Sequence, residues 1–135
     1  MNPHQTLVKE TREWLEHAQA DLDACTALIA AGLAAEALFH AQQCAEKAIK
    51  AVLTWHQVSF RKTHDLDELK EVCLPLAGDA GSHLAGIERL SQYAWRFRYP
   101  GAPYSPGRTE AEEAKQAAGR LLDALAARLE SQFGD

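Results

Sequence analysis

The sequence predicts an all-α protein: an antiparallel up-and-down four-helix bundle with an additional short helix. Alanine and leucine dominate the apolar residues, while β-branched residues are scarce, which favours helix. Apolar side chains recur at steps of three and four residues, the spacing of one helix face. Glycine and proline mark the expected helix ends. The length of 135 residues fits a single domain, residues 1–135, with a core large enough to fold without metal or disulfides.

The first two helices are expected from about Gln5 to Ala31 and from about Ala34 to Gln57, separated by a stop at Gly32. The first carries a heptad-like seam with one polar member. Its residues are Val8, Thr11, Leu15, Ala18, Leu22, Cys25 and Ile29. The second is expected to bury Leu38, Ala41, Ala45, Ile49 and Val52. These two segments therefore supply the first half of the bundle.

A shorter helix is expected to begin at Asp65, because Asp65 and Glu68 form a capping-box pattern. Its inner stripe would be Leu66, Leu69 and Cys73, and Pro75 with the loop at residues 78–82 would end it. The fourth helix is expected from about His83 to Arg98. Its inward residues would be Leu84, Ile87, Leu90, Ala94 and Phe97.

The last helix is expected after a loop that is rich in proline and glycine, residues 100–108. Thr109 and Glu112 form a second capping-box pattern at its start. Its apolar face continues nearly to the end of the chain, through Ala111, Ala114, Ala118, Leu121, Leu125 and Leu129.

The charge distribution indicates an anionic ligand more clearly than the total charge does. The chain carries a net charge of −5, so it has no global basic field that would attract nucleic acid. Residues 89–108, however, contain four arginines and no carboxylate. These are Arg89, Arg96, Arg98 and Arg108. A local positive patch on an acidic protein favours binding of an anion.

Cysteine usage and the first residues favour a cytoplasmic protein. Cys25, Cys44 and Cys73 are odd in number, form no C-x-x-C motif and fall on or near apolar helix faces, as buried thiols do. The start of the chain lacks the pattern of a signal peptide, and the longest apolar run is too short to cross a bilayer. We therefore expect no membrane association.

The six histidines do not form a recognisable metal site, and no complete catalytic set is present. We expect neither a bound metal nor a cofactor. His64 stands apart, because it precedes the helix start at Asp65 and follows Arg61 and Lys62. It is either a capping or packing histidine or part of a ligand site.

Two polar residues fall on the inward stripe of the second helix, Gln42 centrally and Glu46 at its edge. Burial of either group requires a hydrogen-bonding partner. They therefore form either a structural contact between helices or a polar pocket. Arg98 projects about 20° from Ile87, towards the core, whereas Arg96 projects into solvent. Arg98 is expected either to pair with a carboxylate such as Glu46 or to bind a phosphate.

These segments resemble the HEPN domain (higher eukaryotes and prokaryotes nucleotide-binding). The run from Ala37 to Leu53 is similar to its second helix, Thr63-His64-Asp65-Leu66 to the entry of its third, and Arg98-Tyr99-Pro100 to the end of its fourth. The resemblance covers about residues 5–130. It implies a four- or five-helix bundle, usually a homodimer and often encoded beside a small nucleotidyltransferase.

Many members of that family are toxin or defence ribonucleases with an Arg-x4–6-His motif. Carried over, the arginine falls on Arg98, but the histidine positions hold Pro103, Tyr104 and Ser105, and counting from Arg96 supplies no histidine either. Cleavage of RNA without a metal needs a group that titrates near neutrality. The resemblance therefore supports binding of anions more than catalysis.

Three functions follow from these observations. The first is a dimeric module that binds a nucleotide or an RNA phosphate and is paired with a nucleotidyltransferase. In it Arg98 binds phosphate, Gln42 and Glu46 orient Arg98, and Tyr99 and Tyr104 border the base. The second is a metal-independent ribonuclease toxin that uses Arg98 with His64 or Tyr104. The third is a purely structural interaction bundle.

Overall fold

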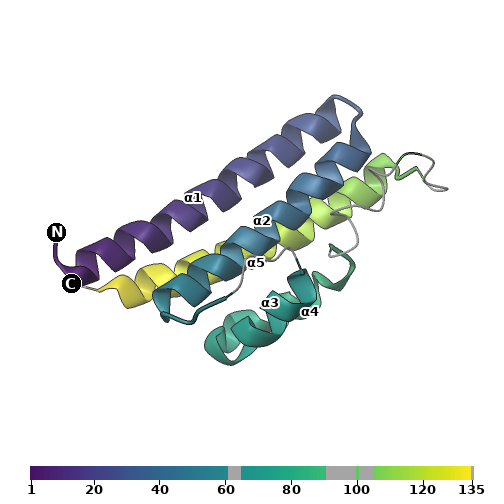
Figure 1. Cartoon of the computed structure of the whole chain (residues 1–135). Helices are drawn as coiled ribbons and strands as arrows, with labels where there is room; N and C mark the ends of the chain where they lie inside the picture. Colours follow the sequence, from purple (N-terminus) through teal and green to yellow (C-terminus); the bar gives the residue numbers. More distant parts are fainter. Residues whose placement is uncertain (61–64, 91–99, 101–104, 135) are drawn as a thin grey trace.

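The computed structural model describes residues 1–60, 65–90, 100 and 105–134, and every regular element in those ranges is helical. Three long helices lie side by side: α1 (Pro3–Ala30), α2 (Ala34–Trp55) and α5 (Arg108–Phe133) (Figure 1). The shorter α3 (Leu66–Cys73) and α4 (Ser82–Ala85) pack beside α2 and α5, respectively. The expected all-α fold is confirmed.

The chain direction alternates across this bundle. A tight turn centred on Gly32, which has a positive φ of 77°, reverses the chain between α1 and α2. The start of α1 meets the end of α5, where Nε2 of His4 lies 3.1 Å from the carbonyl oxygen of Phe133. Helix α1 is therefore antiparallel to both α2 and α5, and the two ends of the chain lie together (Figure 1).

Helix α2 is the centre of the fold. It contacts α1 on one side, α5 on another and α3 near its end, which explains why its apolar stripe is solvent-free. All five residues that the sequence placed on this stripe are buried, and so is the predicted inner face of α5. In α1, the seam residues are buried or pack against the core. Helical periodicity therefore located the core of all three long helices.

Of the two helix starts that capping patterns predicted, the structure confirms one and contradicts the other. Asp65 caps α3 as expected, because its side chain accepts hydrogen bonds from the backbone N–H groups of Asp67 and Glu68. The capping box expected at Thr109 is wrong. The N-cap of α5 is Gly107, two residues before Thr109, and Glu112 instead accepts a hydrogen bond from Nε of Arg108.

The prediction of an uninterrupted helix from His83 is also wrong for residues 83–90, the part of it that the structure describes. After α3 the chain passes through two 3-10 turns, Leu74–Leu76 and Gly78–Gly81, and α4 then ends at Ala85, before Gly86. Residues 88–90 form another 3-10 turn. Such turns align every third residue, so Leu84, Ile87 and Leu90 are buried as expected. The rest of that predicted helix, with Ala94 and Phe97, lies outside the described residues.

A contact between a glycine and an arginine attaches this irregular segment to α5. Gly78 has a positive φ of 55°, and the guanidinium of Arg128 covers the position that a Cβ atom would take. Nε of Arg128 donates a hydrogen bond of 3.2 Å to the carbonyl oxygen of Leu76. In the described part of the chain, no helix is long and apolar enough to span a membrane.

Candidate functional site

A row of three polar side chains lies buried on one face of α2. Gln42, Glu46 and Lys50 follow one another at intervals of four residues, the spacing that places side chains on the same helix face. Their exposed fractions are 0%, 2% and 7%. The sequence predicted the inward position of Gln42 and Glu46 but not the burial of Lys50. We call these three residues the α2 polar row.

The carboxylate of Glu46 is held at both oxygens from within its own helix. Nζ of Lys50 donates to Oε2 at 3.1 Å, and Nε2 of Gln42 lies 3.4 Å from Oε1. Oε1 of Gln42 in turn accepts a hydrogen bond of 2.8 Å from Gln43. A buried carboxylate without such contacts would be strongly unfavourable, so these contacts explain how the row is tolerated in the core.

The ammonium group of Lys50 is also enclosed by aromatic rings. Its Nζ lies 5.6 Å from the ring centroid of Trp14 in α1 and 5.7 Å from that of Phe60, which follows α2. The two rings contact each other edge to face. Cation–π attraction therefore adds to the ion pair with Glu46 and stabilises a charged lysine that is largely removed from water.

A second polar cluster joins α1 to α2. The buried carboxylate of Asp21 accepts from Nδ1 of His40 at 2.8 Å and from Nζ of Lys47 at 2.6 Å. The pairing of His40 and Lys47 with Asp21 was not predicted from the sequence. Because His40 and Lys47 are seven residues apart, they share a face, and this spacing was the available signal.

The remaining residues of the predicted site lie outside the described residues. These are His64, Arg98, Tyr99 and Tyr104. Of the basic stretch, Arg108 is exposed and paired with Glu112. Arg89 and Arg120 line a hollow of about 310 Å³ between the end of α4 and α5, together with Glu110 and Glu113. Carboxylates therefore accompany the arginines of this stretch that the structure describes.

The three cysteines are buried and free, as the sequence predicted. Burial raises the pKa of Cys25 to about 11 and the pKa of both Cys44 and Cys73 to about 12. Thiols with such high pKa values are poor nucleophiles and poor metal ligands near neutral pH. Over the described ranges, no group of histidine, cysteine and carboxylate side chains is arranged to hold a metal ion.

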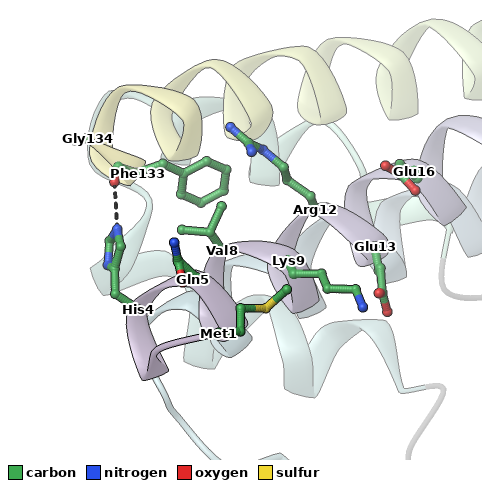
Figure 2. Close-up of a pocket in the computed structure, with 10 residues that line it drawn as sticks. All are labelled: Met1, His4, Gln5, Val8, Lys9, Arg12, Glu13, Glu16, Phe133 and Gly134. Carbon is green, nitrogen blue, oxygen red and sulfur yellow. Dashed lines mark hydrogen bonds between the residues drawn. The ribbon is translucent and has the colours of Figure 1, made fainter.

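A separate pocket lies elsewhere, where α1 begins and α5 ends (Figure 2). It has a volume of about 680 Å³. Val8 and Phe133 provide apolar surface, while Lys9 and Glu13 extend along α1 (Figure 2). Arg12 is already engaged there, because it pairs with Glu130 and lies over the ring of Phe133. The sequence did not single out this pocket, which is distinct from the α2 polar row.

The helices form a bundle of a known class. The chain belongs to the HEPN domain family, whose model matches residues 11–129. The family resemblance noted from the sequence is therefore confirmed.

Individual relatives span nearly the whole chain. The protein named "Putative toxin MJ1304" from Methanocaldococcus jannaschii is 26% identical over 94% of this chain and 93% of its own length. A solved structure described as ST0689, an archaeal HEPN homologue, has a TM-score of 0.68 and 25% identity, covering 92% of this chain and 98% of its own. The structure of TT1696 from Thermus thermophilus has a TM-score of 0.69 and 28% identity, covering 87% of this chain and 96% of its own.

Proposed function

We propose that this HEPN-domain protein is the toxin-like member of a two-protein system and binds the phosphate group of a nucleotide or of RNA. In this proposal it acts as a cytoplasmic homodimer and is paired with a small nucleotidyltransferase. Membership of the HEPN family and likeness to a relative named as a toxin support the toxin-like role. The phosphate site is proposed beside the α2 polar row.

The observation that carries the proposal is the charge balance of the α2 polar row. Its one carboxylate, Glu46, is already paired with a cation, Lys50, and both are buried. The formal charges of Glu46 and Lys50 cancel. A further cation beside them would therefore give this group of side chains a net positive charge. We propose that Arg98 is this cation and that a phosphate supplies the balancing charge, because the arginine guanidinium suits phosphate oxygens.

The other predicted residues take supporting roles in this proposal. Gln42 and Glu46 orient Arg98 from the core side, Tyr99 and Tyr104 border the base, and His64 lies at the edge of the site. Stacking of a base on an aromatic ring contributes about 1–3 kcal/mol, so these tyrosines would favour nucleotides over inorganic phosphate.

Equilibrium binding tests the proposal. The affinity for 5′-AMP and for a short single-stranded RNA is measured over a range of salt concentrations, for the wild type, Arg98→Ala and the matched control Arg96→Ala. We expect Arg98→Ala to weaken binding about tenfold or more, because it removes a charge-assisted contact, while Arg96→Ala changes it little. Equal affinities of the two variants would refute the role of Arg98. A wild type that binds neither probe would refute the function.

A ribonuclease toxin is the second candidate, favoured by the likeness to a relative named as a toxin. In this reaction a base removes the proton from a 2′-hydroxyl, and Tyr104 or His64 would have to act beside Arg98. Incubation of metal-free protein with total RNA tests this activity. Intact RNA at high protein concentration would exclude it, whereas cleavage that Arg98→Ala abolishes would support it.

A further inference from the structure

The Asp21 cluster, formed by Asp21, His40 and Lys47, orients a histidine ring between α1 and α2. Nδ1 of His40 lies 2.8 Å from Oδ1 of Asp21. A carboxylate can only accept a hydrogen bond, so Nδ1 carries the proton. In the neutral ring the other nitrogen, Nε2, then keeps its lone pair. This is the form of histidine that accepts a proton from another group.

Contacts from two helices hold this ring without using Nε2. Nζ of Lys47 lies 2.6 Å from Oδ2 of Asp21, the oxygen that His40 leaves free. Both oxygens of the carboxylate are therefore occupied, and its side chain is only 10% exposed. The ring of Phe39 lies edge to face with that of His40, with 5.5 Å between their centroids. The orientation of the imidazole is thus set by the fold.

Nε2 of His40 is available to a ligand. The side chain of His40 is 35% exposed, and Nε2 has no hydrogen-bonding partner within the described part of the chain. The formal charges of Asp21 and Lys47 cancel, so a proton taken up by His40 gives the cluster a net positive charge. Such a cluster suits a reaction in which the substrate loses a proton and gains negative charge beside it.

We propose that His40 is the general base of a metal-independent cleavage of RNA and that Asp21 is its positioning residue. This inference rests on the ribonuclease candidate described above, and His40 takes the place of Tyr104 or His64 as the base. Nε2 of His40 removes the proton of a 2′-hydroxyl, and the 2′-oxygen attacks the adjacent phosphorus. The bond between phosphorus and the 5′-oxygen breaks, and the 5′-oxygen takes a proton from water. The products are a 2′,3′-cyclic phosphate and a 5′-hydroxyl end, and His40 returns its proton to the solvent.

Cleavage of a short RNA by the wild type in the presence of EDTA tests this role, with the product ends identified by mass spectrometry. We expect His40→Gln to lower the rate about a hundredfold or more, because general-base catalysis contributes roughly 10²–10⁴ in rate. Glutamine keeps a donor for Asp21 but cannot accept the proton. His17→Gln is the matched control, since it removes an exposed histidine of α1, and it should cleave at the wild-type rate. DNA of the same sequence lacks the 2′-hydroxyl and should stay intact.

Chemical rescue distinguishes a base from a histidine that only joins two helices. His40→Ala leaves a space beside Asp21 that free imidazole can enter. Added imidazole should therefore raise the rate of His40→Ala about tenfold or more and leave the wild type unchanged. Asp21→Asn should lower kcat about tenfold or more with little change in KM, because an amide can hold the ring in the wrong tautomer. A purely structural cluster predicts lower stability without rescue by imidazole.

The outcomes separate this inference from the functions above. If the wild type binds 5′-AMP or RNA but cleaves no RNA, the ribonuclease candidate and this inference fail, while the binding function stands. If the wild type cleaves RNA and the folded His40→Gln cleaves equally fast, only the role of His40 fails. An equal loss in His40→Gln and His17→Gln would also overturn it.

Urea unfolding of each variant verifies that it is folded. Should the variants of His40 not fold, treatment of the wild type with diethyl pyrocarbonate decides, with the modified histidines mapped by mass spectrometry. Loss of cleavage in proportion to the modification of His40 supports the proposal. A His40 that does not react, or full activity with His40 modified, overturns it.

Discussion

Gly78 occupies a position where a larger residue meets two obstacles. Its φ of 55° lies in the left-handed region, which is strained for residues with a side chain, and the guanidinium of Arg128 fills the space of a Cβ atom. We expect Gly78→Ala to lower the free energy of unfolding by about 1–3 kcal/mol. Urea denaturation measures this change.

Gly119 is the matched control for this prediction. It lies inside α5, where a Cβ atom would make ordinary contacts with the side chain of Leu22. Gly119→Ala should therefore raise the free energy of unfolding by about 0.5–1 kcal/mol, because alanine favours helix. Shifts of the same sign in Gly78→Ala and Gly119→Ala would contradict the explanation.

The cysteines should be unreactive in the native protein. Their raised pKa values, about 11 for Cys25 and about 12 for Cys44 and Cys73, leave little thiolate near pH 8. We expect a disulfide reagent to label none of them in the folded state and all three after denaturation. Rapid labelling without denaturant would show that a thiol is accessible.

The same pKa values make stability depend on pH. An unfolded thiol loses its proton near pH 9, whereas the folded thiols retain theirs up to about pH 11 or 12. The unfolded state therefore binds fewer protons in this window, and the free energy of unfolding contributed by the thiols falls as pH rises through it. Below pH 9 their contribution is fully present.

At the scale of elements, the Asp21 cluster holds α1 against α2. Asp21→Ala removes one carboxylate that pairs with His40 and Lys47 across the helices. Because both partners keep some contact with water, we expect a loss of about 2–3 kcal/mol, below that of a fully buried pair. Thermal or urea unfolding measures it. Asp23→Ala, which removes an exposed carboxylate bonded to Gln19, should change stability by less than about 0.5 kcal/mol.

The helical spacing of apolar residues correctly predicted α1, α2 and α5, each of which buries one long, uninterrupted face. It failed after His83, because the spacing of Leu84, Ile87 and Leu90 suits a 3-10 turn as well as an α-helix, and Gly86 weakens the α-helix. The spacing of apolar residues within one element therefore cannot distinguish an α-helix from a 3-10 helix when both bury the same residues.

The candidate site was predictable only in part. Gln42 and Glu46 were placed inward because polar residues on an apolar stripe are conspicuous in a sequence. Burial of Lys50 depends on Trp14 and on Phe60, which belong to other segments. The pairing of Asp21 depends on the register between α1 and α2, which no spacing within a single helix contains. The roles of Arg98 and its neighbours remain predictions.

At the scale of the whole molecule, Phe133 links three helices at one end of the bundle. Its ring packs on Trp55 of α2 at 4.9 Å and lies under the guanidinium of Arg12 of α1. Phe133→Ala should lower the free energy of unfolding by about 3 kcal/mol. Hydrogen exchange should show faster exchange at the start of α1 as well as at the end of α5.

An effect confined to α5 would contradict this prediction. Leu74→Ala provides the comparison, because Leu74 is an exposed apolar residue, 54% accessible, and its loss should change stability by less than about 0.5 kcal/mol.

The first helix begins beside the end of the last helix. The packing of the helices therefore does not require their present order along the chain. His4 contacts Phe133 directly, and Figure 1 shows both ends side by side. A short linker would therefore span them, and the exposed turn at Gly32 offers a place to open new ends. A circularly permuted chain that begins with α2 and finishes with α1 should then reach the same arrangement, with the α2 polar row intact.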